Sequence, residues 1–411
     1  MAHAILKSIH PVNLLSFGPK TEPIELRPLN LLIGPNGSGK SNFIEVIRLL
    51  HFLPDKEPWE VVLNTGGIDE WIWKGTKGKD SQCSISTKFS LDEISKREIG
   101  AKPEVLGLSM ELQKNGPSFR VKRESIGTYG EGSYFDPLLN SFESSGSQGK
   151  ISFRVGRGEA GASAFNLNMD RSILSQLASP TVQAFGIGDL PELFKIAELF
   201  ESFDFHQDWE FGVDCTPREP LPVGQPVSRL EENSYNLAQM LAHYRDNHKP
   251  VFEQLTELVK RFYEPTKSVE IRLISTSLQV FIEEKGGFST PATRLSDGML
   301  RWLSILCILL NPTPPPVTCI DEPELGFHPD VIPTLADLLR EASTRTQLIV
   351  TTHSSALVDA FTDDPESICV CEKVEDSTVI RRLSQPDLAV WLKDYSLGNL
   401  WTSGEIGGNR W

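Results

Sequence analysis

The chain has 411 residues, 39% of them hydrophobic, and carries a formal net charge of −15. A chain of this length can bury the cores of about two or three domains. Its negative charge argues against a protein whose whole surface binds nucleic acid, because the duplex is itself a dense line of negative charge. No run of about 18 apolar residues occurs, and the N-terminus lacks the order of a secretory signal. We therefore expect a cytoplasmic protein with no membrane partner.

The N-terminal part predicts short strands at 4–9 and 23–28, then the buried strand "LNLLI", a glycine-rich loop and a helix that is apolar on nearly all sides. The following segments alternate like strands and are separated by Gly and Ser clusters. The chain then becomes helical, with apolar residues three and four apart, and the Pro-rich stretch 215–228 indicates an exposed connector.

Strand and helix alternate again near the C-terminus, where "VTCI", "QLIVTT", "SICVC" and "TVIRRL" indicate a parallel sheet covered on both faces. The sequence therefore predicts an α/β fold in which one domain is split by a long insert. We expect the first half of the domain at residues 1–75 and its second half at residues 286–385. Between them we expect a strand-rich part at residues 76–180 and a helical insert at residues 181–285. A tail follows at residues 386–411. The tail is too apolar to remain in water, so it should pack, with Leu388, Trp391 and Tyr395 at helical spacing.

Six cysteines are scattered along the chain, most of them within apolar runs, which favours free buried thiols over a disulfide framework. Cys369 and Cys371 would share one face of a strand. No second pair and no histidine cluster follows them, so we expect no metal there.

The stretch "GPNGSGKSN" fits the pattern G-x-x-x-x-G-K-[ST] between a buried strand and a helix. Its glycines let successive backbone N–H groups turn toward one anion, and the helix N-terminus adds its positive end. Lys40 would reach the outer phosphates of ATP, and the Ser41 hydroxyl would bind Mg²⁺. The predicted nucleotide-binding residues are Gly34, Pro35, Asn36, Gly37, Ser38, Gly39, Lys40, Ser41 and Asn42.

The stretch "PVTCIDEPELGFHP" places Asp321 at the C-terminal end of a buried strand, where it could hold Mg²⁺ through water. Glu322 follows directly and is the candidate general base, because a second carboxylate beside the metal can polarise an attacking water. The alternative for Glu322 is a structural carboxylate that caps a neighbouring loop.

Two further motifs lie nearby in the sequence. "TTHSS" ends the next strand and puts His353 at the same sheet edge, where a neutral imidazole could hydrogen-bond the γ-phosphate; alternatively it is a satisfied core histidine. "TRLSDGMLRWLSILCILL" has Ser296 and Asp297 as helix N-cap candidates and, taken alone, is an ordinary capped core helix.

These four motifs, in this order, resemble the head of ABC-type ATPases, and in particular the branch that contains RecF, the SMC proteins and the OLD-family ATPases. The resemblance covers about residues 1–50 and 290–372. It implies a P-loop NTPase head with a split nucleotide-binding domain and a β-plus-helical insert, which binds and hydrolyses ATP with Mg²⁺. It also implies that "LSDG" is the signature motif, whose Ser296 and Gly298 complete the site of a second copy in a head-to-head dimer. The D-loop of the family then falls at 324–328.

A Q-loop glutamine is also implied as a Mg²⁺ ligand. The best match is Gln176 in "MDRSILSQLASP", with Gln148 and Gln113 as alternatives. The chain differs from SMC proteins in its compact insert and from OLD nucleases in ending at residue 411. Its C-terminal residues resemble the tail of stand-alone bacterial ATPases that occur beside a nuclease in defence or repair loci.

The resemblance therefore implies an ATPase, slow without its partner, that pairs on ATP and controls a nuclease-like effector or DNA-related work in phage defence or DNA repair. The alternatives are a transporter subunit, which "DEPELGFHP" in place of "DEPTSALD" disfavours, and an ATP-locked scaffold that does not hydrolyse. Any DNA contact should lie within 111–160, where basic and acidic residues nearly balance. The candidates there, which could equally form the solvated face of a hairpin, are Arg120, Lys122, Arg123, Lys150, Arg154 and Arg157.

Overall fold

The computed structural model describes residues 4–75, 82–91, 105–129, 135–143, 149–153, 161–179, 191–207, 209–224 and 227–408. The chain divides into two compact units. The N-terminal unit draws on residues 3–203, 369–383 and 406–411, and the C-terminal unit on residues 204–368 and 384–405. Each unit is therefore built from segments that are distant in the sequence.

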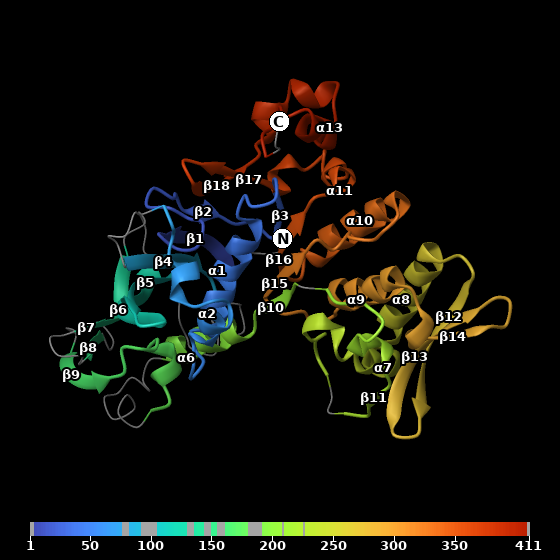
Figure 1. Ribbon diagram of the computed structural model, residues 1–411, viewed down its shortest axis with the longest axis horizontal. Coiled ribbons are helices and arrows are strands. Elements are labelled where there is room, and N and C mark those ends of the chain that lie inside the picture. The colour runs from blue at the N-terminus through green and yellow to red at the C-terminus, as the bar shows by residue number, and fades with distance from the viewer. Residues whose placement is uncertain are drawn as a thin grey trace. The chain divides into compact units, whose positions relative to one another are not determined.

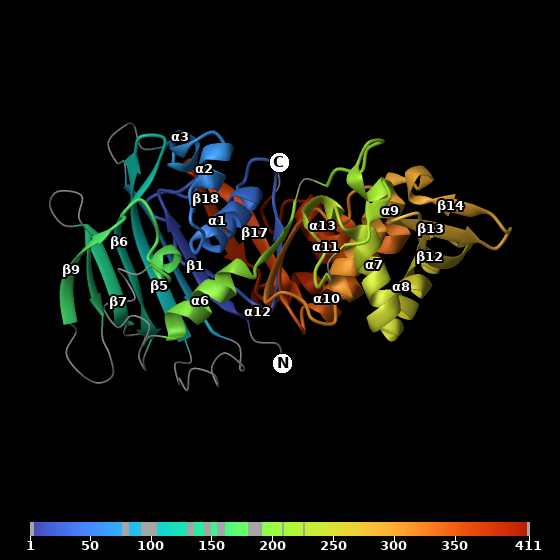
Figure 2. The ribbon, with the colours of Figure 1, turned by 90° about the horizontal axis from the view of Figure 1, so that it is seen from below.

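An antiparallel sheet of eight strands dominates the N-terminal unit, in the order β2-β1-β4-β5-β6-β7-β8-β9 (Figure 1). Every second residue of β4 is buried, which gives the sheet one core face. The helices α1 (Lys40–Phe52) and α6 (Pro191–Glu201) are in contact (Figure 2). The ring centroids of Phe200 on α6 and Phe89 on β4 are 5.2 Å apart. The strands are β1 (Leu6–Val12), β2 (Ile24–Glu25), β4 (Gln82–Phe89), β5 (Val105–Asn115), β6 (Ser118–Tyr129), β7 (Phe135–Glu143), β8 (Gly149–Phe153) and β9 (Gly161–Leu167).

The same unit contains the buried strand β3 (Leu29–Ile33), which neighbours the hairpin of β17 (Ile368–Val374) and β18 (Ser377–Arg382). The sequence had indicated parallel strands here, and this is wrong for the pair of β17 and β18, which is antiparallel. The reason is a tight turn in which Glu375 and Asp376 both have positive φ, 50° and 64°. That geometry matches a two-residue hairpin turn, and no Gly or Asn marks it in the sequence. Short helices of this unit are α2 (Glu60–Asn64), α3 (Ile68–Trp71) and the 3₁₀ turn η1 (Leu174–Gln176).

Parallel strands form the centre of the C-terminal unit, in the order β10 (Asp204–His206), β15 (Val317–Asp321) and β16 (Gln347–Thr352). All of β16 and all but the last residue of β15 are buried, as continuous apolar runs predict. The register places Asp321 opposite Thr351. The carboxyl ends of β15 and β16 therefore meet at one edge. The helices around them include α9 (Asp297–Leu309), α10 (Ile332–Ala342) and α11 (Ser355–Asp359).

The helices α7 (Leu237–Asn247) and α8 (Lys249–Phe262) form the helical part of the insert, but the residues after them do not continue it. Instead β12 (Thr266–Ile274) and β13 (Ser277–Glu284) form a hairpin, joined by β11 (Leu221–Pro222) and β14 (Ser289–Pro291). The expectation of a helical insert to residue 285 is therefore wrong from residue 266. Alternating buried and half-exposed residues in β12 explain the difference, because that period fits a strand.

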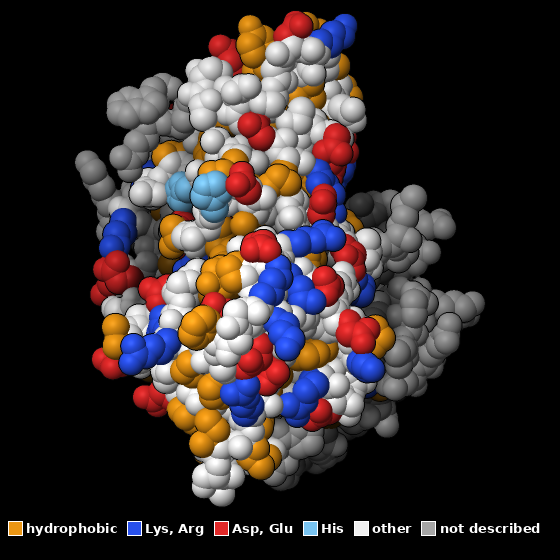
Figure 3. Space-filling view, turned by 90° about the vertical axis from the view of Figure 1, so that its right-hand side faces the viewer, with side chains coloured by type: hydrophobic (Ala, Val, Ile, Leu, Met, Phe, Trp, Pro, Cys, Tyr) orange, Lys and Arg blue, Asp and Glu red, His pale blue; other side chains and the backbone are white. Residues whose placement is uncertain are grey.

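The charges on the face shown in Figure 3 are of both signs and lie close together. On α8 and the β12–β13 hairpin they form ion pairs, such as Lys260 with Glu257 at 2.6 Å. Arg272 is likewise paired with Glu270 and Glu283. This mixture gives no reason to expect a nucleic-acid surface here.

The C-terminal tail packs as predicted through Leu397, Leu400 and Trp401, which are buried on α13 (Leu397–Thr402). This helix contacts α11, and the Gly398 N–H donates to Asp359 Oδ1 at 2.6 Å. In contrast, Trp391 and Tyr395 are 44% and 53% exposed. Short turns of this unit are α12 (Gln385–Leu388), η3 (Thr216–Arg218), η4 (Glu232–Ser234), η5 (Ala292–Arg294), η6 (Pro329–Val331), η7 (Pro365–Ser367) and η8 (Trp391–Lys393). Among the described residues, no helix has the length and apolarity needed to cross a membrane.

All six cysteines are free, and five of them are buried. Burial raises the pKa of the Cys83 thiol to about 12, so the thiolate is disfavoured. Within the part of the chain that the structure describes, no group of three or more His, Cys, Asp or Glu could hold a metal ion.

Candidate active site

The phosphate loop joins β3 to α1 within the N-terminal unit, as its motif requires. Lys40 is the first residue of α1 and is 6% exposed, and its Nζ donates to the carbonyls of Gly34 at 2.8 Å and Pro35 at 3.1 Å. The Ser38 hydroxyl is buried and has no hydrogen-bond partner among the residues that the structure describes. A buried donor without a partner and an ammonium group over the loop fit a site that receives an oxyanion.

The backbone of the loop is fixed by close neighbours. Gly34 has a φ of 152°, and a Cβ there would collide with the Cys371 carbonyl oxygen of β17. The Thr378 hydroxyl of β18 lies 2.8 Å from the Ser38 carbonyl oxygen, so the hairpin supports the loop. Asn36, Gly37 and Ser41 are exposed on its outer side.

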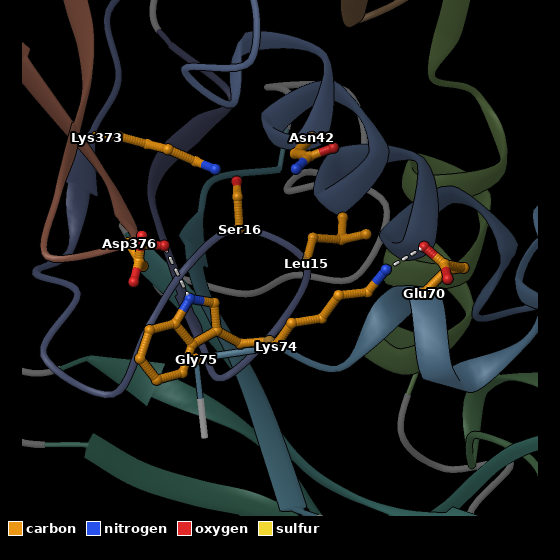
Figure 4. Close-up of a pocket in the computed structure, with 9 residues that line it drawn as sticks. Leu15, Ser16, Asn42, Glu70, Lys74, Gly75, Lys373 and Asp376 are labelled. Carbon is orange, nitrogen blue, oxygen red and sulfur yellow. Dashed lines mark hydrogen bonds and ion pairs between the residues drawn. The ribbon is translucent and has the colours of Figure 1, made fainter. Parts of the chain in front are cut away.

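A pocket of about 420 Å³ lies beside this loop, within the N-terminal unit (Figure 4). Its wall includes Ser16 and Asn42, and Asn42 is on the first turn of α1. The indole Nε1 of Trp73 donates to the Asp376 carbonyl at 3.1 Å, which ties the aromatic wall to the β17–β18 turn. Lys74 is paired with Glu70 on the opposite wall. The volume of this pocket lies within the range of small-molecule binding sites.

The two predicted carboxylates follow β15 in the C-terminal unit. Asp321 is the last residue of the strand, and its Oδ1 accepts a hydrogen bond from the Thr351 hydroxyl of β16. Glu322 has a φ of 44°, in the left-handed region, where a residue other than glycine costs about 1–3 kcal/mol. Its N–H donates to the Thr351 carbonyl at 3.2 Å and the Thr351 Oγ1 at 3.1 Å. A strained residue at a strand end is a recurrent property of functional sites.

His353 follows β16 and meets Glu322, with 3.4 Å between His353 Nε2 and Glu322 Oε1. Both side chains are about one-third exposed and therefore remain accessible to a ligand. The His353 N–H donates to Glu324 Oε1 at 3.1 Å, and the Thr352 hydroxyl donates to the same oxygen. Glu324 is 8% exposed, and burial raises the pKa of its carboxyl group. The sequence placed Glu324 only at the start of the D-loop, whereas here its carboxyl group also holds the backbone of His353.

Arg301 and Trp209 also contact the carboxylate cluster, which consists of Asp321, Glu322 and His353. Neither of the two was predicted. Arg301 lies on α9 and is 7% exposed, and its Nη1 donates to the Glu322 carbonyl at 3.0 Å. Burial lowers the pKa of its guanidinium, while Glu324, Glu322 and Asp321 raise it. The Trp209 Nε1 donates to the Asp321 carbonyl at 2.8 Å. A signal for Arg301 was present, since it is a lone charged residue within an apolar helix.

The predicted signature residues begin α9. Ser296 is its N-cap and accepts the Met299 N–H at 3.1 Å, and Ser296 and Asp297 are both exposed. The Arg218 guanidinium holds this loop, and donates to Asp297. Arg218 is 7% exposed, so the Pro-rich stretch that was expected to be an exposed connector is anchored here. Its backbone partners are the carbonyls of Phe211, Gly212, Ala292 and Leu295.

The predicted D-loop packs against the same helix. The Phe327 ring lies 5.4 Å from Trp302 of α9 and 5.7 Å from Phe262 of α8. A Cβ on Gly298 would lie 3.4 Å from the Gly326 carbonyl oxygen. The predicted signature and D-loop residues are therefore in contact within the C-terminal unit.

The Q-loop assignment stays a prediction. Gln176 lies in η1 of the N-terminal unit, and its Nε2 donates to the carbonyls of Asn168 at 3.0 Å and Ser172 at 3.2 Å. Its amide therefore closes a local loop. Gln113 lies on β5, opposite Gln82 of β4, and Gln148 is outside the described residues.

The candidate DNA-contacting residues lie on the eight-stranded sheet of the N-terminal unit. Arg120 is paired with Asp170 at 3.0 Å, and Arg123 is 4.0 Å from Glu111 with a side chain that is 63% exposed. Lys122 lies between them on β6, and Lys150 is on β8. The remaining two, Arg154 and Arg157, are outside the described residues.

The predicted magnesium ligands are oxygen donors, the type that this ion prefers. Ser41 of the N-terminal unit offers a hydroxyl and Asp321 of the C-terminal unit a carboxylate, both hard oxygen ligands. The Gln176 Oε1, in contrast, accepts the Asn168 N–H at 3.1 Å within its own loop. Mg²⁺ is commonly held by one or two protein oxygens, with phosphates and water supplying the rest. When bound, the ion would neutralise charge on the β- and γ-phosphates.

The sequence matches one protein family over residues 29–121 and 137–359, and this family is described as "AAA domain, putative AbiEii toxin, Type IV TA system". The match spans well over half of the chain. The chain belongs to this AAA-domain family. None of the curated proteins compared with it matches.

Two solved structures show the fold of this AAA-domain protein. An SMC head bound to the C-winged helix domain of ScpA is 13% identical, with a TM-score of 0.56 over 93% of this chain and 99% of that one. An SMC head with an extended coiled coil, bound to the C-terminal domain of ScpA derived from Pyrococcus furiosus, is also 13% identical, with a TM-score of 0.53 over 95% and 99%. The predicted α/β fold of an ABC-type P-loop ATPase head is confirmed, and so is the resemblance to SMC-type ATPases.

Proposed function

We propose that this AAA-domain protein binds ATP with Mg²⁺ at the phosphate loop and hydrolyses it with Glu322 as the general base. The observation that supports hydrolysis most directly is the pair of Glu322 and His353, 3.4 Å apart at the ends of adjacent parallel strands beside Asp321. In this proposal Asp321 holds the ion, Glu322 accepts the proton of the attacking water, and His353 donates to the γ-phosphate. Lys40 and the Ser38 hydroxyl bind phosphate oxygens.

The test is the substitution Glu322→Gln, which keeps the size of the side chain and removes its basicity. It should leave ATP affinity within about twofold and lower the turnover number at least about 100-fold, the scale for loss of a general base. ATP binding is followed by calorimetry and turnover by phosphate release. Near-normal turnover in this variant would show that another group is the base, and normal binding without turnover in the wild type would favour the ATP-locked scaffold.

We further propose that ATP pairs two copies of the chain head to head, with Ser296 and Gly298 of one copy contacting the nucleotide of the other. The exposure of Ser296 and Asp297 at the start of the 13-residue helix α9 supports this role, because a helix N-terminus favours a phosphate. Mixing Lys40→Ala chains with Ser296→Arg chains should restore one intact site per mixed pair. A wild-type chain that hydrolyses ATP as a strict monomer at every concentration would contradict the pairing.

The biological output that we propose is control of a partner effector, nuclease-like in chemistry, in phage defence or DNA repair. Support comes from the family description, which names a putative toxin of a type IV TA system, and from SMC heads solved with a ScpA domain bound. The Glu322→Gln variant, isolated from its own cells, should retain its partner in the presence of ATP and release it in the presence of ADP. Direct DNA work is the weaker form of the proposal, and charge reversal of the basic residues on β6 would test it through the salt dependence of DNA affinity.

A further inference from the structure

Two consecutive backbone carbonyls at the end of β15 are each held by a side chain from a distant segment. Trp209 Nε1 donates to the Asp321 carbonyl at 2.8 Å, and Arg301 Nη1 donates to the Glu322 carbonyl at 3.0 Å. Trp209 follows the edge strand β10, and Arg301 lies on the helix that begins with the signature motif. Neither residue belongs to a phosphate-binding or hydrolytic motif of the sequence.

Both hydrogen bonds lie beside a residue with an unfavourable backbone conformation. Glu322 has a φ of 44°, and a residue with a Cβ leaves this region unless its surroundings hold it there. Its N–H is fixed on one side by Thr351. The carbonyl of the same residue is fixed on the other side by Arg301. The peptide units on both sides of the Glu322 Cα are therefore pinned, and with them the direction of the carboxylate.

The two donors also hold each other. The Trp209 ring is stacked with the rings of His206 and Phe211, with a centroid distance of 5.9 Å in each pair and interplanar angles of 20° and 21°. The Arg301 guanidinium lies against two of these rings, 5.4 Å from the Trp209 centroid and 5.7 Å from that of Phe211. A planar guanidinium packed on aromatic faces has few alternative positions, whereas a lysine would lose this support.

We propose that Arg301 and Trp209 are positioning residues that hold the strained backbone of Glu322 and so aim its carboxylate at the attacking water. This rests on the proposed function, in which Glu322 is the general base. The two residues set the rate of the chemical step and leave the affinity for ATP unchanged, because they bind no part of the nucleotide. Since Arg301 is carried by α9, the helix that presents Ser296 and Gly298 also fixes the base of the same copy.

The experiment compares Arg301→Met, Arg301→Lys and Trp209→Phe in the full chain, each alone and combined with Glu322→Gln. Arg345→Met is the matched control for the arginine, because the Arg345 guanidinium also donates to one backbone carbonyl, that of Leu309, at 2.8 Å. Trp59→Phe is the control for the indole, since Trp59 Nε1 donates to the Asp170 carbonyl at 2.6 Å in the other unit. The readouts are the turnover number, ATP affinity, the unfolding midpoint, and amide hydrogen exchange of residues 317–327.

Arg301→Met should lower the turnover number about 10- to 100-fold and leave ATP affinity within about twofold of the wild type. This is the scale expected when a residue that orients a reactive group is lost. Arg301→Lys should be intermediate, and Trp209→Phe should cost about fivefold, the scale of one neutral hydrogen bond. In the Glu322→Gln background each substitution should change the residual rate by less than about twofold, because no base remains to be aimed. In Arg301→Met, the rate of amide hydrogen exchange within residues 317–327 should rise at least about fivefold. The two controls should leave turnover, ATP affinity and amide exchange at residues 317–327 unchanged.

A fall in turnover of the same factor with and without Glu322 would overturn the proposal and assign Arg301 a general structural role. Unchanged hydrogen exchange at 317–327 in Arg301→Met would overturn it too, and this readout needs no hydrolysis. The failure of the proposed function looks different: the wild type would not turn over ATP, or Glu322→Gln would leave turnover unchanged. In either case the exchange measurement still decides whether Arg301 holds the Glu322 backbone.

Discussion

The phosphate loop of the N-terminal unit and the carboxylate cluster of the C-terminal unit both hold reactive groups in place, but by different means. The loop is shaped by its own backbone, because Gly34, Gly37 and Gly39 have positive φ and the neighbours of Gly34 and Gly39 leave no room for a Cβ. The cluster is shaped by side chains, since Asp321, Glu322 and His353 are held by Thr351, Trp209, Arg301 and Glu324. A substitution in the phosphate loop should therefore lower the stability of the fold. In the carboxylate cluster, a substitution can lower activity while the fold stays intact.

The largest effect should come from Arg218, the extreme case of a side chain that shapes the C-terminal unit. Its buried guanidinium donates to four backbone carbonyls and to Asp297, so Arg218→Met leaves several buried acceptors without a donor. Each costs about 1–3 kcal/mol, and we expect a total loss of about 4 kcal/mol in the free energy of unfolding. Arg345→Met, which removes one carbonyl contact of a more exposed arginine, should cost less than about 1.5 kcal/mol. Equal losses in denaturant unfolding would contradict this account of Arg218.

Gly34→Ala tests the backbone-built site. The added Cβ would collide with the Cys371 carbonyl oxygen, and the φ of 152° is itself unfavourable for alanine, so we expect a loss of about 3 kcal/mol. Gly37→Ala separates the two causes, because Gly37 has a φ of 79° but no described atom lies within 4 Å of the place that its methyl group would take. It should cost only the strain, about 1 kcal/mol. If denaturant unfolding gives the two variants the same stability, the collision with β17 is not what fixes the loop.

Glu124 of β6 shows that the N-terminal unit also depends on one buried carboxyl group. Its oxygens accept hydrogen bonds from the Ser172 hydroxyl at 2.7 Å and the Ile173 N–H at 2.8 Å, and burial raises its pKa from 4.5 to about 7. Because the folded-state pKa is the higher one, the stability from this group is fully present below about pH 4.5 and is lost as the pH rises through about 7.

The full size of this pH effect is about 3 kcal/mol, because the pKa difference between 4.5 and about 7 corresponds to about 1.4 kcal/mol per unit. The measurement is the difference in unfolding free energy between the wild type and Glu124→Gln, from pH 5 to pH 8.5. The wild type should lose stability relative to Glu124→Gln across this range, since the amide does not ionise. A difference that stays constant with pH would show that Glu124 is already ionised in the folded protein at pH 5.

The same contrast explains what the sequence could and could not predict. The phosphate loop is a contiguous motif whose flanking strand and helix are visible in the pattern, so its placement followed directly. Asp321, Glu322 and His353 were expected at one edge because parallel strands end together, and Glu322 and His353 do meet. Trp209 and Arg301 were missed, since their partners lie 112 and 21 residues away in the sequence and no hydrophobic period encodes such a contact. The β17–β18 hairpin was missed because Glu375 and Asp376 give no turn signal.

The smallest effect on stability should come from Gly298→Ala, and it separates a glycine kept for folding from one kept for function. Gly298 is the second residue of α9, outside the positive-φ region, and a Cβ would meet the Gly326 carbonyl oxygen only at 3.4 Å. Alanine favours a helix over glycine by up to about 1 kcal/mol, which offsets the tight contact, so the unfolding free energy should change by less than about 1 kcal/mol.

If the signature loop contacts the nucleotide of a second copy, the added methyl group should nevertheless weaken ATP-dependent pairing in the Glu322→Gln background at least about tenfold, by holding the phosphate away from the helix N-terminus. Sedimentation with and without ATP measures this pairing. Unchanged stability with unchanged pairing would leave Gly298 no part in the interface and would direct the search for the contact to the exposed D-loop residue Leu325.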